Sequence, residues 1–459
     1  MFRLVFYVAS GLLCASVVAA AERPNIILIL ADDVGIEGLG CYGGTSYRTP
    51  HLDQMAAEGV RFTHAYAQPL CTPTRVQLMT GKYNHRNWRA FGILDPQETT
   101  FGHALQASGY ATAIFGKWQL ESYDPPDWPG AAQRRGTGMH PKHAGFDEYA
   151  LFHALHTEDK GSRYANPTML EGRAGSEGEL KSYPGGYGED VWGDKILDFL
   201  DRHPDQPSFV YYPMALPHWP FQPTPRSSDW DPHQPQPTDL RYSVDMIEYM
   251  DTAVGNLLGG LQQRDRADDT IVVFYSDNGT HLDVFSKLKD GRTIQGGKAT
   301  PQQTGIHVPL IVRCPDRFEP AVCDALVDAS DFFPTLMHWA GTRQSSDTPR
   351  DGISFASQLN GQTGPQRQIA FFWYDPRPGW DKQRFGRSVF ALNKNYKLFR
   401  GGPLMRLTDR PLEAIEVDPQ AMTATDLAAQ AELQAYIDAQ MANVTEPPLV
   451  DAYGQPIKL

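Results

Sequence analysis

Cysteine is scarce in this chain, with five among 459 residues. Four remain if an N-terminal leader is removed: Cys41, Cys71, Cys314 and Cys323. Four thiols are too few to form a disulfide framework for a protein of this length. Cys314 and Cys323 are close enough in sequence to close a loop, but spacing alone leaves that pairing open. The fold must therefore rest on a buried core, which a hydrophobic content of 41% can supply.

Long apolar runs are also rare, and only the N-terminus has one. Residues 1–21 combine one early positive charge, Arg3, with an apolar segment and small residues at its end. This layout is typical of a secretory signal peptide cleaved after Ala20 or Ala21, with an uncleaved membrane anchor as the alternative. No later stretch is long and apolar enough to cross a bilayer. We therefore expect an exported protein, periplasmic or extracellular, without stable membrane association after cleavage.

An excess of positive charge is missing as well. The formal net charge is −13, and it becomes −14 when Arg3 leaves with the leader. Nucleic acid is not expected as a partner of so acidic a chain. Glycine (41 residues) and proline (36 residues) are plentiful, which favours long surface loops over a helical bundle.

Apolar runs that end in polar side chains recur along the chain and alternate with segments of helical periodicity. We expect strands over 25–33, 110–118, 207–221 and 268–279, and helices over 49–62, 193–203 and 242–263. This alternation predicts an α/β fold, in which helices sandwich a large mixed, mainly parallel sheet over residues 22–360. Ligands of such sheets bind outside the carboxyl ends of the strands.

Two segments depart from this pattern. Residues 123–190 are rich in glycine, proline and charge, and without sustained periodicity they are expected to form loops. Beyond residue 360, short apolar runs predict antiparallel strands, and one late helix is expected over 425–444. We therefore predict a smaller C-terminal α+β domain, residues 361–459, that contains an antiparallel sheet.

Carboxylate and amide side chains follow two of the predicted strands. Asp32 and Asp33 come directly after one strand, and Asp277 and Asn278 follow another. Oxygen ligands of this kind suit a hard divalent cation such as Ca2+ or Mg2+. Aspartate also commonly caps helices and closes turns, which is the structural alternative. Two acidic strand ends on one sheet edge favour the metal.

Cys71 directly precedes a predicted helix. Pro73 fits the first helical turn, and the apolar run continues to Gly81. Cys71 and Arg75 then lie near the helix N-terminus, where unpaired N–H groups favour an anion. A small buried hydrophobe is the alternative, and position and charge favour a reactive cysteine over it.

Lys117, His218 and Lys298 also lie at or near strand ends. Singly, each fits a solvated lysine or a structural histidine. Placed together beside a cation, they form a positive pocket in an acidic protein, and such a pocket requires an anionic ligand.

The motifs around these residues resemble those of the sulfatases of the alkaline phosphatase superfamily. The stretch "PLCTPTRVQLMTGKY" contains the family's Cys-x-Pro-x-Arg motif at Cys71, Pro73 and Arg75. "NIILILADD", "ATAIFGKW", "FVYYPMALPHWPF", "VVFYSDNG" and "GGKATPQQTGIHVPLIV" follow the family's order, and the resemblance covers about residues 23–360. It implies an alkaline-phosphatase-like fold and a catalytic domain over residues 22–360.

The resemblance also implies a cofactor and a modified residue. A separate maturation enzyme would oxidise Cys71 to formylglycine, whose hydrate has two hydroxyls on one carbon. One attacks sulfur, and deprotonation of the other releases sulfate and restores the aldehyde. One Ca2+ would be held by the following set of residues: Asp32, Asp33, the modified Cys71, Asp277 and Asn278.

Four further residues receive roles from the resemblance. Arg75 would hold the hydrate, Lys117 and Lys298 would bind the sulfate, and His218 would protonate the departing alcohol oxygen. Gln119 departs from the family, which usually has histidine at this position. Glutamine can donate a hydrogen bond to substrate but cannot take up a proton at neutral pH, so sulfate release requires another base or is slow. The segment around Gln303 and His307 departs from the family as well.

We therefore expect a Ca2+-dependent sulfatase whose substrate is a sulfated carbohydrate, since an exported enzyme meets polymers. Trp373, Trp380 and Arg377 offer stacking and anion contacts for a sugar, with ordinary packing as the alternative. Two other functions stay open: a phosphate or phosphonate ester hydrolase of the same superfamily, and a non-catalytic sulfated-glycan binding protein whose Gln119 blocks turnover.

Overall fold

A computed structural model describes residues 23–154, 162–342 and 349–457. The predicted signal peptide, residues 1–21, lies outside the described residues. Within the described ranges, none of the helices has the length and apolar character that a membrane crossing requires.

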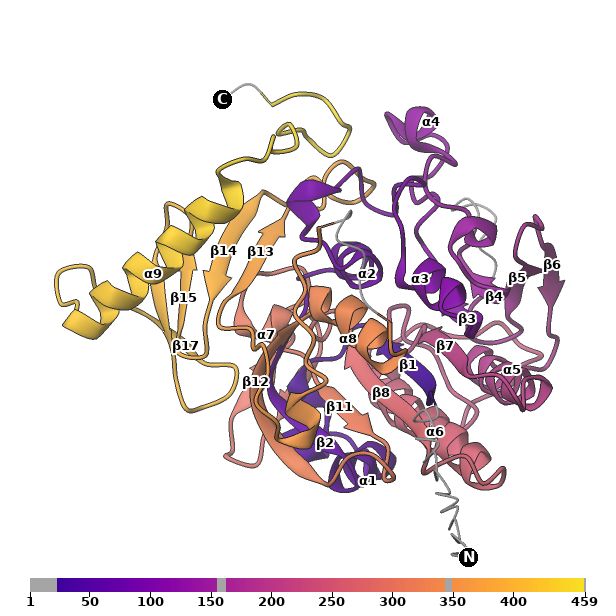
Figure 1. The fold of residues 1–459 in the computed structure, drawn as a ribbon. Coiled ribbons are helices and arrows are strands. Elements are labelled where there is room, and N and C mark those ends of the chain that lie inside the picture. Colours follow the sequence, from indigo (N-terminus) through magenta and orange to yellow (C-terminus); the bar gives the residue numbers. More distant parts are fainter. Residues whose placement is uncertain (1–22, 155–161, 343–348, 458–459) are drawn as a thin grey trace, which may run out of the picture.

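A sheet of ten strands forms the centre of the molecule (Figure 1). Its order is β12-β2-β11-β8-β1-β7-β3-β4-β5-β6. From β8 to β4 all neighbours are parallel, whereas β11 and the edge strands β5 and β6 run antiparallel to their neighbours. The strands are β1 Asn25–Ala31, β2 Val60–Tyr66, β3 Ala111–Lys117, β4 Glu148–Phe152, β5 Thr168–Arg173, β6 Glu179–Ser182, β7 Ser208–Pro213, β8 Thr270–Ser276, β11 Leu310–Arg313 and β12 Ala321–Asp328. The predicted mixed, mainly parallel sheet is confirmed.

Helices cover both faces of this sheet. Strand β1 shows why, because its alternate residues belong to two separate cores: Ile26 and Leu28 to one, Ile27 and Ile29 to the other. Helices α2 Cys71–Thr80, α3 Phe101–Ala107 and α8 Phe332–Trp339 pack in the first core. Helices α1 Pro50–Ala57, α5 Gly188–Arg202 and α6 Tyr242–Gln262 pack in the second. A strand that is apolar on both sides is thereby buried on both sides.

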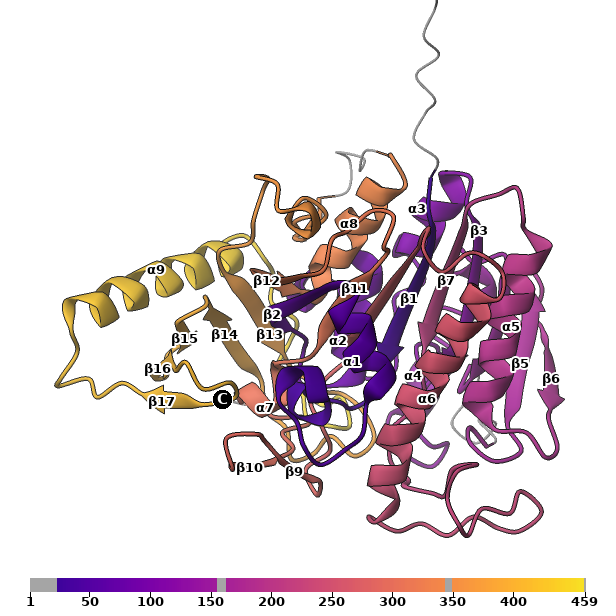
Figure 2. The same cartoon turned by 90° about the horizontal axis from the view of Figure 1, so that it is seen from below.

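A second, antiparallel sheet lies at the C-terminal side, with the long helix α9 packed on it (Figure 2). Its five strands follow in sequence order, β13 Ala370–Tyr374, β14 Ser388–Leu392, β15 Tyr396–Phe399, β16 Leu404–Leu407 and β17 Ala414–Glu416, and α9 spans Ala424–Met441. The shorter elements are α4 Ala131–Arg134, α7 Gln303–Ile306 and the hairpin of β9 Phe285–Lys287 and β10 Thr293–Gln295. Leu70 and Cys71 share one apolar cluster with Phe371 and Trp373 of β13. The C-terminal sheet therefore packs directly against the start of α2.

The expectation of loops over 123–190 is wrong, because β4, β5 and β6 lie within this range. Strand β6 is exposed throughout, and β5 is buried only at Met169 and Leu170. An edge hairpin with this much polar surface lacks the apolar signal by which strands are predicted. The strand expected over 207–221 is also shorter than predicted. Strand β7 ends at Pro213, and His218 lies in the loop that follows it.

The thiols of Cys314 and Cys323 are both free in the structure. Cys314 is buried, and its Sγ lies 3.3 Å from the carbonyl oxygen of Asp268. The loop-closing disulfide that the spacing left open is therefore not formed here.

A buried ion-pair network fastens the segment before the C-terminal sheet to the rest of the molecule. Arg367 is 4% exposed; its Nε donates to Asp331 Oδ2 at 2.8 Å, and its Nη1 lies 3.3 Å from Asp328 Oδ2. Replacing Arg367 by methionine leaves both carboxylates buried without their cation, so we expect a loss of about 3–5 kcal/mol in the free energy of unfolding. Urea denaturation measures this loss. The exposed Arg410→Met control is expected to stay within about 0.5 kcal/mol of wild type, and an equally stable Arg367→Met protein would contradict the network's role.

Candidate active site

The acidic residues meet because β1 and β8 are adjacent and parallel, with Ala31 opposite Ser276. Both strands therefore end at the same level, and the residues that follow them lie side by side. Asp33 accepts a hydrogen bond from Asn278, Nδ2 to Oδ1 at 2.8 Å, and its own N–H donates to Asp277 Oδ1 at 3.2 Å. Asp32, Asp33, Asp277 and Asn278 are all buried. The structure brings together every residue of the predicted acidic group.

Helix α2 brings Cys71 to this group. The helix ends at Gly81, as predicted, and Gly81 has the left-handed conformation; Cys71, expected directly before the helix, is its first residue. Thr74 Oγ1 donates to the carbonyl oxygen of Asp277 at 2.5 Å, which fixes the first helical turn to the end of β8. Arg75 donates to Asp277 Oδ2 through Nε at 3.1 Å and Nη2 at 3.0 Å. One carboxylate therefore joins the helix to the sheet.

The two predicted lysines face the carboxylates. Lys117 Nζ lies 2.6 Å from Asp32 Oδ2, and Lys298 Nζ lies 2.5 Å from Asp33 Oδ2. Lys117 reaches this position because Gly116, with φ +136°, lets β3 pass close to β7. A Cβ at Gly116 would lie 2.0 Å from the carbonyl oxygen of Pro213.

Opposed charges set the protonation of the group. Burial by itself raises the pKa of Asp32, but Lys117, then Arg75 and Lys298, hold it below its ordinary value. Burial, followed by the charge of the Asp32 carboxylate, raises the pKa of Asp277 to about 7. Burial also raises the pKa of the Cys71 thiol. The position at a helix N-terminus therefore does not by itself lower the pKa of this thiol, because burial acts in the opposite direction.

The donor atoms fit a hard cation. Single ligand atoms of Asp32, Asp33 and His218 lie within 4.8 Å of one another, as do those of Asp32, Cys71 and Asp277. Asp32 Oδ1 and Asn278 Oδ1 are buried and have no hydrogen-bond donor among the described residues. Buried acceptors without a donor are costly, and a cation satisfies them. Oxygen-rich donors suit Ca2+ or Mg2+.

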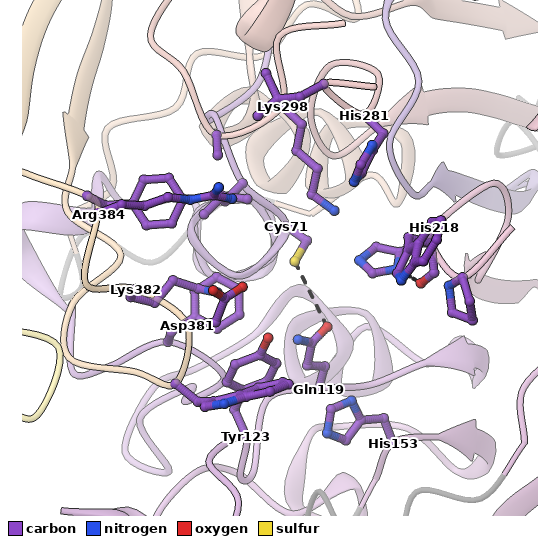
Figure 3. A pocket seen from close by; sticks show the side chains of 18 of the residues that line it. Cys71, Gln119, Tyr123, His153, His218, His281, Lys298, Asp381, Lys382 and Arg384 are labelled. Carbon is purple, nitrogen blue, oxygen red and sulfur yellow. Dashed lines mark hydrogen bonds between the residues drawn. The ribbon is translucent and has the colours of Figure 1, made fainter. Parts of the chain in front are cut away.

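A pocket of about 460 Å3 opens above Cys71 (Figure 3). Cys71 Sγ lies 3.9 Å from Gln119 Oε1, and the Gln119 N–H donates to the His153 carbonyl oxygen at 2.9 Å. The labelled side chains around Cys71 are Gln119, Tyr123, His153, His218, His281, Lys298, Asp381, Lys382 and Arg384. All of them line the pocket, so cationic and aromatic groups dominate its wall.

His218 is held by a buried carboxylate. Glu189 Oε1 accepts hydrogen bonds from the N–H groups of Ala215 at 2.9 Å and Leu216 at 3.0 Å, which fixes the loop after β7. His218 Nδ1 contacts the carbonyl oxygen of Trp219, and Nε2 lies 3.9 Å from Asp33 Oδ2. Burial, followed by the charges of Lys298 and Lys117, lowers the pKa of His218. The imidazole is therefore neutral by default, with Nε2 on the side of the acidic group.

Backbone conformations that most residues avoid are concentrated at this site. Eight described residues other than glycine have positive φ, and five of them lie at the strand ends or on the pocket wall. Such conformations each cost of order 1–3 kcal/mol and persist where the surroundings hold them, often at functional sites. The five are Asp33 (φ 78°), Gln119 (φ 56°), His153 (φ 55°), Ala299 (φ 70°) and Asp381 (φ 63°).

Sequence reasoning missed part of the pocket wall. Tyr123, His153 and Arg163 lie in the range expected to be loops, and Lys382 and Arg384 lie between β13 and β14. A run of basic residues between two predicted strands, in "WDKQRFGR", was the only available signal for the last two.

Of the three residues that the sequence suggested for sugar contacts, one lines the pocket and two are structural. Trp380 is 38% exposed and lines the pocket. Trp373 is buried in the C-terminal core, and Arg377 Nε lies 2.9 Å from Asp375 Oδ1, so these two are structural. His307 is likewise structural, since it stacks on Tyr66 at 4.8 Å between ring centroids.

The fold gathers acidic strand ends, a cysteine at a helix N-terminus and two lysines at one edge of a mainly parallel sheet, which is where enzymes with such sheets bind their ligands. The profile of the family described as Sulfatase matches residues 24–342, so the chain belongs to the sulfatase family and is a sulfuric ester hydrolase.

Relatives and solved structures agree with this assignment. Arylsulfatase A of Homo sapiens is 30% identical over 390 residues, which cover 81% of this chain and 73% of that protein. An N-acetylgalactosamine-6-O-sulfatase of Bacteroides thetaiotaomicron is 29% identical over 418 residues, covering 76% and 78% respectively. A solved structure described as a complex with its substrate D-glucosamine-2-N,6-O-disulfate superposes with a TM-score of 0.67 at 23% identity, covering 92% of this chain and 98% of that one.

Proposed function

We propose that the protein hydrolyses a sulfate monoester on a sulfated carbohydrate, after Cys71 has been oxidised to formylglycine by a maturation enzyme. The observation that carries the proposal is the position of Cys71: it is buried beside carboxylates, its pKa is raised, and it forms the floor of the pocket. A thiol held neutral is a poor nucleophile but remains available as the precursor of an aldehyde.

The residues around Cys71 supply what sulfate transfer requires. We assign one Ca2+ to the oxygens of Asp32, Asp33, Asp277 and Asn278 and to the modified Cys71; when bound, it neutralises charge on a sulfate oxygen and lowers the pKa of a neighbouring hydroxyl. The hydrate of formylglycine offers one hydroxyl for attack on sulfur and a second whose deprotonation releases sulfate.

The side chains at the carboxylates orient the substrate and move a proton. Lys117 and Lys298 hold the sulfate oxygens, and their ion pairs with the Asp32 and Asp33 carboxylates fix the positions of both ammonium groups. Arg75, engaged by Asp277, fixes the first turn of α2. His218 keeps Nδ1 on the Trp219 carbonyl, so a proton taken up at Nε2 can be given to the departing alcohol oxygen.

The carbohydrate substrate is supported by the pocket and by the relatives. Trp380 and Tyr123 offer aromatic faces, and cationic groups are frequent on the wall. The N-acetylgalactosamine-6-O-sulfatase and the complex with a disulfated glucosamine both concern sulfated sugars. We further propose that residues 1–21 direct export, which N-terminal sequencing of the mature protein tests.

The test is mass spectrometry of the Cys71 peptide from the native source, together with sulfate release from a panel of sulfated oligosaccharides. We expect formylglycine at position 71 and release of inorganic sulfate. Matched 4-nitrophenyl sulfate and phosphate esters are assayed in parallel. A clear preference for phosphate would overturn the substrate assignment, and active enzyme with an unaltered thiol would overturn the mechanism.

The role of His218 predicts a dependence on the leaving group. His218→Ala should lower kcat for a sugar sulfate by about 10²–10⁴-fold, because an alkoxide needs a proton as it departs. The loss should be much smaller for 4-nitrophenyl sulfate, whose phenolate leaves without help. Steady-state kinetics on both substrates measure the split, with His233→Ala in an exposed loop as the control. Equal losses on both substrates would show that His218 is not the proton donor.

A further inference from the structure

One lysine of the pocket differs from the others in its partners. Lys382, between β13 and β14, is 5% exposed and lines the pocket next to Asp381. Its Nζ lies 4.1 Å from the centroid of the Phe91 ring and 5.1 Å from that of Tyr123. Within the described part of the chain, no carboxylate or carbonyl oxygen forms an ion pair or hydrogen bond with this Nζ. Lys117 and Lys298, by contrast, each pair with an aspartate.

A buried ammonium without an ion-pair or hydrogen-bond partner is costly, and aromatic faces offset only part of the cost. Burial lowers the pKa of Lys382 to about 8, even though the nearby Asp381 carboxylate acts in the opposite direction. The side chain thus remains mostly cationic at neutral pH. A group kept in this state lowers its free energy when an anion enters the pocket.

Arg384 extends the same wall. It is exposed, lines the pocket, and places its guanidinium 5.1 Å from the centroid of the Phe385 ring. Among the described residues it too has no carboxylate partner within 4 Å. Among the described residues, Asp381 is the one acidic member of the pocket lining, and it is exposed. Arg163, a further basic residue of the lining, already has one donor engaged, because its Nη2 donates to the Trp219 carbonyl.

We infer that Lys382 and Arg384 form a second anion-binding site, which holds a further sulfate or carboxylate of the substrate while the scissile sulfate lies at Cys71. The pocket of about 460 Å3 has room for a sugar that bears both groups. The site selects doubly anionic sugars over singly charged ones. This inference rests on the proposed function, because it takes the group at Cys71 to be the scissile sulfate.

Binding to the unmodified full-length chain, loaded with Ca2+, tests the inference without turnover. The probes for calorimetry are two compounds with one anionic group, benzenesulfonate and glucosamine 6-sulfate. Benzenesulfonate is compared with two more highly charged counterparts, benzene-1,3-disulfonate and 3-sulfobenzoate. Glucosamine 6-sulfate is compared with its more highly charged counterpart, glucosamine 2-N,6-O-disulfate. We expect each counterpart to bind about tenfold or more tightly, since a charge-assisted hydrogen bond contributes at least this much. The disulfonate and the sulfobenzoate distinguish a second sulfate from a carboxylate.

Two variants locate the effect, and a third controls for charge. In Lys382→Met and in Arg384→Met, the compound with two anionic groups should bind hardly more tightly than the compound with one, so the ratio of their affinities falls toward one. The exposed Lys287→Met variant keeps the wild-type ratio. The inference is overturned if no counterpart binds wild type more tightly, or if the ratio survives in both pocket variants. Failure of the proposed function is recognised by a different measurement. In that case native enzyme releases no sulfate, regardless of the affinities measured for these probes.

Discussion

Cys71→Ser, produced in a host whose maturation enzyme accepts only cysteine, is expected to release no sulfate. A serine hydroxyl offers one oxygen where the hydrate offers two, so no internal route remains for releasing the sulfate. Loss of a nucleophile costs on the order of 10⁴-fold or more in kcat. Sulfate release by native and variant protein measures the loss, and mass spectrometry of the position-71 peptide confirms its chemical state.

The variant should nevertheless fold, because serine is close to cysteine in size and the contacts of Thr74 and Arg75 fix the start of α2 independently. Circular dichroism and the melting temperature test this. Cys41→Ser is the matched control: Cys41 is a half-buried thiol outside the pocket lining, and its replacement should leave turnover intact. Turnover near wild type by Cys71→Ser would remove the aldehyde from the mechanism.

Asp277→Asn is expected to have the second large effect. Asp277 lies at the centre of the site, where Oδ2 accepts from Arg75 and Oδ1 from the Asp33 N–H. Asparagine keeps the size but removes one negative charge from the cation site. Loss of a residue that only contacts a metal ligand lowers metal affinity or activity by about 10–100-fold. Because Asp277 is a proposed ligand itself, we expect a larger fall in both Ca2+ affinity and turnover.

Metal analysis and sulfate release measure both losses, and chelation provides an independent readout. A bound ion at 100 times its Kd stabilises the folded state by about 2.7 kcal/mol, so chelation should lower the melting temperature of wild type. Chelation should barely change that of Asp277→Asn. Asp324→Asn, whose carboxylate is largely exposed and pairs with Lys394, is the control. Wild-type Ca2+ affinity in Asp277→Asn would exclude this residue as a ligand.

Local sequence patterns were sufficient for the elements that form the sheet and the floor of the site. The apolar run of β1 and the acidic pair after it identify a buried strand with ligands at its end. Pro73 in the first turn and Gly81 after the last residue identify α2, which begins at Cys71, one residue earlier than expected. Each of these signals depends on the chemistry of a few neighbouring residues. A fold that ignored these local preferences would bury backbone N–H and C=O groups without hydrogen-bond partners.

Other elements were beyond such patterns. Strands β5 and β6 are short and partly or wholly exposed, so they have little apolar periodicity to detect. His218 lies in the loop after β7, and the position of this loop depends on hydrogen bonds to Glu189 of helix α5. The pKa of the Cys71 thiol was also beyond such patterns, because it depends on burial by the whole surrounding structure and not on the helix N-terminus alone.

The sequence by itself determined the residues that can do the chemistry: oxygen donors after two strands, a modifiable cysteine before a helix, and lysines to hold an anion. Only the tertiary structure decided which side chains share the pocket, since Lys382 and Arg384 reach it from a sheet that begins about 300 residues after Cys71. The physical reason is that residue type sets what a group can bind or donate. Burial and counter-charges, which come from distant segments, set whether that group is already paired or still available to a ligand.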